Sequence, residues 1–210
     1  MNLFTKLLVL FFAFSSAFVF AQLKINSEVT FSDKMVDVLT DTKISLSELK
    51  GKIVVLEWFN QKCPFVEKHY NMSKKNMQNL QAEAKKAGVI WITVNSSAEG
   101  NEGFIKDNIE ARKIRDNLGM NSNYFVLDHN GSIGKMFGAK VTPHMFIIKD
   151  GKLVYEGAID SKKSTEVADI EKAKKYFADA MTSIIAGNAP LMASTEEYGC
   201  SVKYSTKASL

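Results

Sequence analysis

A cysteine followed by a proline stands where an apolar run gives way to a polar segment. Residues 53–59 (IVVLEWF) are almost continuously apolar, which is typical of a strand buried on both faces of a sheet. Cys63 follows a short turn, and Pro64 suits the first position of a helix because its missing N–H would be unpaired there anyway. The free N–H groups of a helix start and the charge of Lys62 both favour the thiolate, the reactive form of cysteine. We therefore expect Cys63 to be a redox-active nucleophile rather than an inert buried thiol.

Glu57 is the one charged residue inside the apolar run. A carboxylate in such a strand is costly unless it is paired. Burial would raise the pKa of Glu57 towards neutrality, as a general acid or base for a thiol requires. We expect Glu57 to relay protons to the thiol; the alternative is a structural buried ion pair with Lys68 or another lysine.

The second cysteine, Cys200, lies in an irregular C-terminal segment. An even pair of cysteines in an oxidising compartment is compatible with a disulfide, but the sequence alone does not show whether the two sulfurs meet. Cys200 could resolve an oxidised Cys63, form a structural disulfide or remain an idle thiol. These alternatives stay open at this stage.

The arrangement around Cys63 resembles the thioredoxin superfamily, in which a hydrophobic strand delivers a cysteine to a helix start. Glu57 lies six residues before Cys63, where thioredoxins carry a buried acid that shuttles protons. Thr142-Pro143, in the stretch KVTPHMFIIKDGK, resembles the loop that places a cis proline against the catalytic cysteine. The resemblance implies an α/β, thioredoxin-like fold with a central mixed β-sheet flanked by helices, covering roughly residues 29–187.

The stretches WFNQKCPFVEKHYN, VNSSAEGNEG, TPHMF and YGCSVKY most resemble bacterial exported redoxins, that is, peroxiredoxin-like or alkyl hydroperoxide reductase/thiol-specific antioxidant proteins. This resemblance implies a thiol oxidoreductase that reduces protein disulfides or small peroxides and is regenerated by an external thiol reductant. It also implies a set of residues that position the substrate beside Cys63. We expect that set to comprise Thr142, His144, Lys62 and Pro64, with Pro143 aligning the substrate backbone.

Several substitutions separate this chain from the better-known thioredoxins and peroxiredoxins. Val66 replaces the second cysteine of C-x-x-C, and Asn60 stands where peroxiredoxins carry threonine. The two arginines, Arg112 and Arg115, fall in an expected surface helix. These differences keep a second hypothesis open: a non-catalytic binding module with a structural Cys63–Cys200 disulfide.

Hydrophobic periodicity and turn signals predict alternating strands and helices. The alternation of strand, helix and strand after residue 53 predicts a parallel pair with a right-handed crossover. Expected strands are 53–59, 89–94, 124–127, 145–148 and 153–155, with an N-terminal hairpin of 29–31 and 36–39; expected helices are 64–87, 109–118, 133–137 and 165–186.

The ends of the chain and its composition narrow the remaining possibilities. Residues 1–21 combine one lysine, an apolar core and small residues before a cleavage position, as in a signal peptide, so we expect a secreted or periplasmic protein. Residues 22–187 should form the redoxin domain, and residues 188–210 a tail that packs on it. A net charge of +4, scattered along the chain, argues against nucleic-acid binding. We expect no membrane span in the mature chain, no cofactor, and no metal site, because the three histidines are widely spaced.

Overall fold

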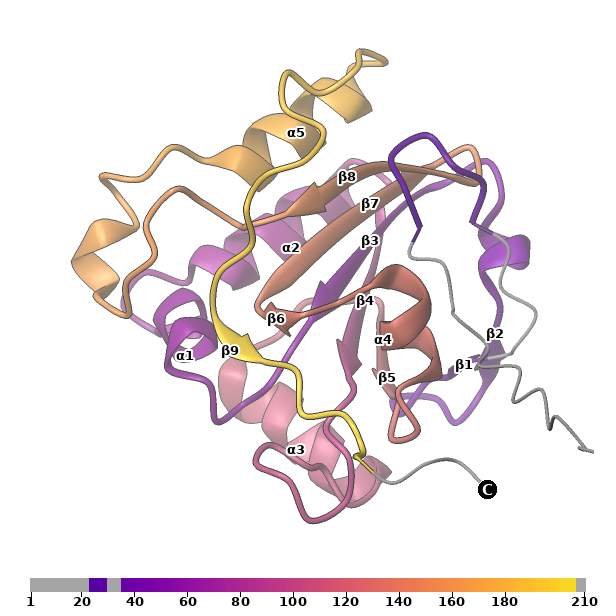
Figure 1. The fold of residues 1–210 in the computed structure, drawn as a ribbon, viewed down its shortest axis with the longest axis vertical. Coiled ribbons are helices and arrows are strands. Elements are labelled where there is room, and N and C mark those ends of the chain that lie inside the picture. Colours follow the sequence, from indigo (N-terminus) through magenta and orange to yellow (C-terminus); the bar gives the residue numbers. More distant parts are fainter. Residues whose placement is uncertain (1–22, 30–34, 207–210) are drawn as a thin grey trace, which may run out of the picture.

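A five-stranded mixed sheet forms the centre of the computed structural model, which describes residues 23–29 and 35–206. The strand order is β5-β4-β3-β7-β8 (Figure 1). Strands β3, β4 and β5 are parallel, whereas β7 is antiparallel to both β3 and β8. This is the α/β, thioredoxin-like architecture that the sequence predicts.

The strands are β1 Met35–Val36, β2 Lys43–Ile44, β3 Ile53–Trp58, β4 Ile90–Asn95, β5 Tyr124–Leu127, β6 Val141–Thr142, β7 His144–Lys149, β8 Lys152–Gly157 and β9 Cys200–Ser201. The helices are η1 Leu46–Leu49, α1 Pro64–Tyr70, α2 Asn76–Lys86, α3 Asn108–Leu118, α4 Ser132–Phe137, η2 Val167–Asp169 and α5 Tyr176–Ile185.

The central strand β3 separates two hydrophobic clusters because successive side chains point to opposite faces of the sheet. Val55 and Phe59 belong to one cluster, together with residues of α2 and α5. Leu56 and Trp58 belong to the other, together with residues of α4 and η1. Burial on both faces explains why this stretch of sequence is so uniformly apolar.

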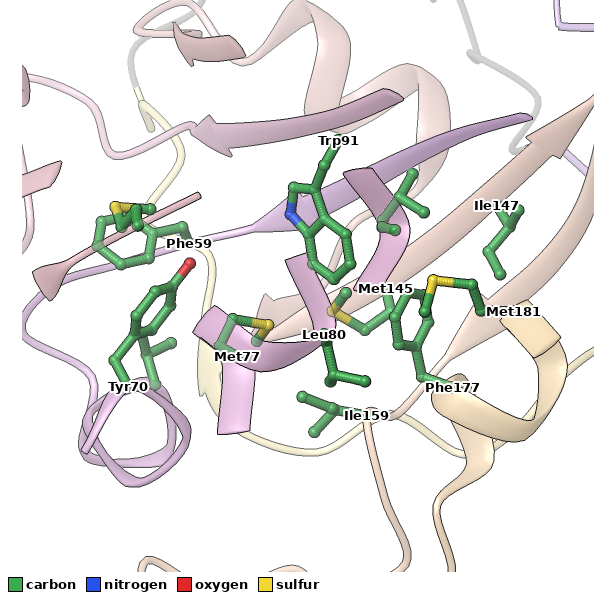
Figure 2. Packing of buried hydrophobic residues seen from close by; sticks show 14 of the residues in the cluster. Phe59, Tyr70, Met77, Leu80, Trp91, Met145, Ile147, Ile159, Phe177 and Met181 are labelled. Atoms are coloured by element: carbon green, nitrogen blue, oxygen red, sulfur yellow. The ribbon is translucent and has the colours of Figure 1, made fainter. Parts of the chain in front are cut away.

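Aromatic contacts close the core on each face of the sheet. On the first face, the ring of Trp91 from β4 lies 5.4 Å from that of Phe177 in α5, with Leu80 of α2 nearby (Figure 2). On the second face, the ring of Trp58 lies 5.6 Å from that of Phe137 in α4 and 5.0 Å from that of Phe146 in β7. The edge-to-face pairs, Trp91 with Phe177 and Trp58 with Phe146, add to the stabilisation that burial of the rings provides.

The helix expected over residues 64–87 is two helices, and this part of the prediction is wrong. Helix α1 ends at Tyr70, and α2 begins at Asn76. Between them, Asn71 Oδ1 accepts hydrogen bonds from Ser73 N at 3.0 Å and Ser73 Oγ at 2.6 Å. Such local bonds compete with the helical ladder, and Lys75 completes the break with a left-handed φ of 52°.

The helix expected over residues 165–186 is also shorter than predicted. Residues 167–169 form only a 3-10 turn, and α5 starts at Tyr176. The backbone around the start of α5 is hydrogen-bonded to the segment that follows β8. Ser161 N donates to Lys174 O at 3.1 Å, and Phe177 N donates to Ile159 O at 3.2 Å. These long-range bonds fix the point at which the helix can begin.

The N-terminal hairpin has a different partner from the one expected. β1 pairs with β2, not with residues 29–31, of which Thr30 and Phe31 lie outside the described residues. The Asp37 side chain favours this turn, because its Oδ2 accepts from Thr40 N at 3.1 Å. The expected signal peptide, 1–21, also lies outside the described residues. Among the helices of the described chain, none has the length and apolar character needed to cross a membrane.

Candidate functional site

Cys63 lies at the junction of strand and helix where the sequence places it. It is the N-cap of α1, and Val66 N and Glu67 N donate to its carbonyl oxygen at 2.9 Å each. Pro64 occupies the first turn, and Asn60 Oδ1 accepts from Lys62 N at 2.8 Å to close the preceding loop. The Cys63 sulfur makes no capping bond to the helix; its side chain turns inward and is 1% exposed.

The Cys63 thiol meets two groups that are distant in sequence. It donates to the carbonyl oxygen of Thr142 at 3.1 Å, and its Sγ lies 2.7 Å from Cys200 Sγ. Both cysteines are free thiols in the structure. The Thr142–Pro143 peptide bond is cis, as expected. The fold therefore brings together four of the predicted site residues: Cys63, Thr142, Pro143 and Cys200.

A short antiparallel pairing brings Cys200 to this position. β9 pairs with β6 so that Cys200 lies opposite Thr142, and Figure 1 shows the tail running from α5 to the edge of β6. Gly199 has a φ of 140°, and a Cβ atom there would lie 2.1 Å from the Thr142 carbonyl oxygen. Glycine at this position therefore allows the two backbones to approach.

Hydrogen bonds of one buried and one half-buried side chain hold the tail on either side of Cys200. Thr195 Oγ1 accepts from Ala158 N at 3.0 Å. Further along, the Tyr204 hydroxyl donates to Ala139 O at 2.8 Å. The ring of Tyr204 lies where a side chain at Gly134 would be, since a Cβ on that residue would approach the hydroxyl to 2.2 Å. Cys200 thus lies in a segment of the tail that is held at both ends by hydrogen bonds to the domain.

The surroundings of Cys200 keep its proton in place. Burial raises the pKa of the Cys200 thiol well above its usual range, and the adjacent Cys63 sulfur raises it further. A protonated thiol is a poor nucleophile. Cys200 is therefore suited to act after its neighbour rather than before it.

Glu57 lies at the centre of a closed network of hydrogen bonds beneath α1. Its carboxylate accepts from the Tyr70 hydroxyl at 2.8 and 3.0 Å, Gln81 Nε2 at 3.1 Å, Trp91 Nε1 at 2.9 Å and Thr93 Oγ1 at 3.3 Å. Burial raises the pKa of Glu57 to about 7, while these donors oppose the shift. Glu57 can therefore both bind and release a proton near neutral pH.

The expected alternative for Glu57, an ion pair with lysine, is wrong. Its partners among the described residues are uncharged donors, and Lys68 instead lies 3.8 Å from Asp160 Oδ2. No hydrogen bond in the described part of the chain joins Glu57 to Cys63 or Cys200. Among the described residues, Glu57 therefore has no direct hydrogen-bonded route to either thiol.

The side chains of two other predicted site residues form no hydrogen bond with the cysteines in the described part of the chain. His144 is 2% exposed, its Nδ1 accepts from Lys140 N at 3.4 Å, and its ring lies 4.4 Å from that of Phe146. Burial lowers the pKa of His144 to about 4, so it is neutral. Lys62 is exposed, and within the described residues its ammonium has no ion pair. Within the described residues, no hydrogen bond from either side chain to Cys63 supports the expected role of Lys62 and His144 in positioning a substrate.

The partners of Glu57 are the functional residues that the sequence reasoning missed. Trp91 and Thr93 are two residues apart on β4, so their side chains point to the same face of the sheet. Thr93 lies opposite Glu57 in the parallel pairing. Because both strands were predicted, the sequence could have shown that Trp91 and Thr93 share one face of β4. Tyr70 and Gln81 come from separate helices, so their convergence depends on the unexpected break between α1 and α2. Among the described residues, no group of three or more His, Cys, Asp or Glu could hold a metal ion.

Replacing Glu57 by glutamine should remove a pH dependence of stability. The pKa of Glu57 in the folded protein, about 7, lies above its ordinary value of 4.5. The native state therefore binds more protons than the unfolded state between these values, and stability falls as pH rises. We expect urea titrations to show a wild-type loss of roughly 3 kcal/mol across this window that Glu57→Gln lacks. The exposed variant Glu83→Gln should keep the wild-type slope; an equal slope in Glu57→Gln would contradict the assignment.

Replacing Gly199 by alanine should move Cys200 away from Cys63. The added Cβ would meet the Thr142 carbonyl oxygen, so β9 must shift. We expect disulfide formation under mild peroxide to slow by roughly tenfold or more, as measured by quenched thiol labelling. Gly88→Ala is the control, because Gly88 also has a positive φ, 75°, but a Cβ there meets nothing within 4 Å. Equal rates in the two variants would show that the close approach at Gly199 is unimportant.

Comparisons with known proteins agree with this architecture. Among solved structures, a hypothetical protein from Sinorhizobium meliloti 1021 is 17% identical, with a TM-score of 0.69 over 89% of this chain and 98% of its own. An uncharacterized conserved protein from Geobacillus kaustophilus is 19% identical, with a TM-score of 0.68 over 91% of this chain and 96% of its own. A cysteine-to-serine mutant of PrxQ from Xylella fastidiosa is 11% identical, with a TM-score of 0.50 over 65% and 86% of the two chains. At these identities the similarity shows a shared fold.

The family comparison is more specific. No curated protein matches the chain. The Redoxin family model matches residues 29–174, which is more than half of the chain and includes Cys63, Glu57 and Pro143. This match supports a thiol oxidoreductase-type role. The chain belongs to the redoxin family.

Proposed function

We propose that this protein is an exported thiol oxidoreductase of the thioredoxin/peroxiredoxin-like type, which reduces disulfides or peroxides with the Cys63 thiolate. The observation that carries the proposal is the 2.7 Å separation between Cys63 Sγ and Cys200 Sγ. A pair of free thiols at this distance can convert to a disulfide with little movement of the backbone. The role would be antioxidant defence or redox homeostasis outside the cytoplasm.

The first step is attack by the Cys63 thiolate. With a peroxide, the sulfur displaces one oxygen of the O–O bond, the leaving oxygen takes a proton, and Cys63 becomes a sulfenic acid. With a disulfide, the thiolate displaces one substrate sulfur and forms a mixed disulfide. In both cases the substrate is reduced and Cys63 is oxidised.

The second step is resolution by Cys200. Its thiol attacks the Cys63 sulfur, loses its proton, and releases water from the sulfenic acid or the second thiol of a disulfide substrate. The product is a Cys63–Cys200 disulfide. An external dithiol reductant then returns both residues to thiols and is itself oxidised to a disulfide.

Glu57 is proposed to manage protons during this cycle. The supporting observation is its pKa of about 7, which allows exchange in either direction at neutral pH. Because no hydrogen bond in the described chain joins Glu57 to either cysteine, we assign the connection between them to water. Its neighbours Tyr70 and Gln81 would hold the carboxylate in place while its proton changes.

The tail favours a small peroxide over a folded protein disulfide as substrate. The resemblance to thioredoxins assigns the Pro143 loop to the substrate backbone, but Cys200 already pairs with Thr142 at that edge. A polypeptide would have to displace β9, whereas a peroxide needs only room beside a sulfur that is 1% exposed. A disulfide substrate therefore requires the larger opening of the tail.

The N-terminal sequence supports export. Residues 1–21 carry the pattern of a signal peptide, so the mature chain would begin near Gln22 and reach the periplasm or the medium. Residues 22–187 would then form the redoxin domain and residues 188–210 the tail. Such a compartment permits the disulfide on which the cycle depends.

The second candidate is a binding module without catalysis, in which Cys63–Cys200 is only a structural disulfide. The burial of Cys63 and the valine at position 66 favour it. A structural disulfide of this kind would resist gentle reduction and would not be regenerated by peroxide. Sensitivity to mild reductants therefore separates the two candidates.

Two cysteine variants should fail at different steps. Cys63→Ser should abolish peroxide consumption, because it removes the nucleophile. Cys200→Ser should still react once and accumulate Cys63 sulfenic acid, which a sulfenate-specific label traps. The measurement is peroxide consumption with a thiol reductant, combined with mass spectrometry of the labelled protein.

The results of these variants separate the proposal from its alternatives. Peroxide turnover retained in Cys63→Ser would contradict it. If the wild-type protein consumes no peroxide but reduces a protein disulfide with both cysteines required, the disulfide substrate is correct. If neither substrate reacts, the binding module is the better account.

A further inference from the structure

A second cluster of buried polar side chains lies beside the two cysteines without touching them. Lys68, His69, Asp160 and Tyr198 are between 0% and 6% exposed. They come from α1, the segment after β8 and the tail. None of them forms a hydrogen bond with Cys63 or Cys200 in the described part of the chain, and the proposed cycle does not use them. Four buried polar groups are costly to maintain unless they are mutually bonded.

Asp160 is the centre of this cluster. Its Oδ1 accepts hydrogen bonds from the Tyr198 hydroxyl at 2.5 Å and Lys162 N at 2.8 Å. Its Oδ2 lies 3.8 Å from Lys68 Nζ and from His69 Nε2. Burial lowers the pKa of His69 to about 3, which leaves Lys68 as the cation beside the carboxylate; burial lowers the pKa of Lys68 as well, and the charge of Asp160 opposes that shift. Asp160 is thus a fixed acceptor for the Tyr198 hydroxyl.

Tyr198 connects this cluster to both halves of the thiol pair. Its ring lies 5.7 Å from the ring of Phe65, two residues after Cys63 on α1, and 5.9 Å from Lys68 Nζ. Only Gly199 separates Tyr198 from Cys200 along the chain. Since Gly199 has no side chain of its own to hold this stretch, the nearest side-chain anchor before Cys200 is Tyr198.

We propose that Tyr198 is a positioning residue for the redox pair, and that its bond to Asp160 holds the Cys200 thiol against Cys63. The inference rests on the proposed function, in which Cys200 forms the S–S bond with an oxidised Cys63 and releases water or a substrate thiol. Tyr198 takes no part in the bond changes. It raises the effective concentration of one thiol at the other by restricting where the tail can lie.

The test is the thiol–disulfide equilibrium of the mature protein with reduced and oxidised glutathione. The ratio of protein disulfide to dithiol gives the effective concentration of Cys200 at Cys63. Tyr198→Phe keeps the ring and its packing but removes the hydroxyl that Asp160 binds. We expect the effective concentration to fall about tenfold, in keeping with the loss of one hydrogen bond to a charged group. Asp160→Asn should act in the same direction, and the double variant should add little to either change.

Two controls separate positioning from general destabilisation. Ile184→Val removes one methyl group from the core of α5, away from the thiols, so it should lower the melting temperature without changing the glutathione equilibrium. In a Cys200→Ser background, Tyr198→Phe should leave the rate of Cys63 with glutathione disulfide unchanged, because no second thiol remains to be positioned.

Each outcome bears on a distinct claim. An unchanged effective concentration in a folded Tyr198→Phe protein would overturn the inference while leaving the proposed cycle intact. An effect of equal size in Ile184→Val would overturn it too, because general stability would then account for the change. If the wild-type protein forms no Cys63–Cys200 disulfide with either oxidised glutathione or mild peroxide, the proposed function itself fails.

Discussion

The antiparallel pairing of Thr142 with Cys200 is the contact on which the arrangement of the site depends. It brings Cys200, near the C-terminus, to Cys63 at the start of α1. The carbonyl oxygen of Thr142 also accepts a hydrogen bond from the Cys63 thiol. The pairing needs a glycine at position 199, because any Cβ would collide with the Thr142 carbonyl. It also needs an ordered tail, which Thr195, Tyr198 and Tyr204 provide.

The same pairing shapes the chemistry available to the site. Cys63 is 1% exposed and Cys200 of the tail lies against its sulfur, so there is little room for a substrate beside that sulfur. Partial burial raises the pKa of the Cys200 thiol, and the proposed cycle accordingly gives the two cysteines different roles. Beneath them, Glu57 is buried among neutral donors, which leaves a carboxyl that can exchange protons near pH 7. In the proposed cycle, burial would thus set both the order in which the two thiols react and the acidity of the nearby carboxyl.

Local sequence patterns were sufficient to predict much of the fold and part of the site. The apolar stretch of β3, the cysteine before Pro64 and the loop at Pro143 each have a signature within a few residues, and the structure has all three where they were expected. The breaks in the two long predicted helices were missed because they depend on hydrogen bonds of Asn71 and Lys174. The spacing of hydrophobic residues, from which the helices were predicted, does not show such bonds. The placement of Cys200 could not be derived, since a tail without periodicity is positioned by contacts with α1, β6 and the segment after β8. For the same reason, the Asp160 cluster had no sequence signal.

The most direct test of the account is the intact mass and thiol count of the mature protein before and after mild peroxide. We expect two free thiols at the start, a loss of two hydrogens and both thiols on oxidation, and full recovery with a gentle dithiol reductant. That result would show that Cys63 and Cys200 form a reversible redox pair. Wild-type protein that keeps Cys200 free while Cys63 remains a sulfenic acid, or a disulfide that resists reduction, would contradict it.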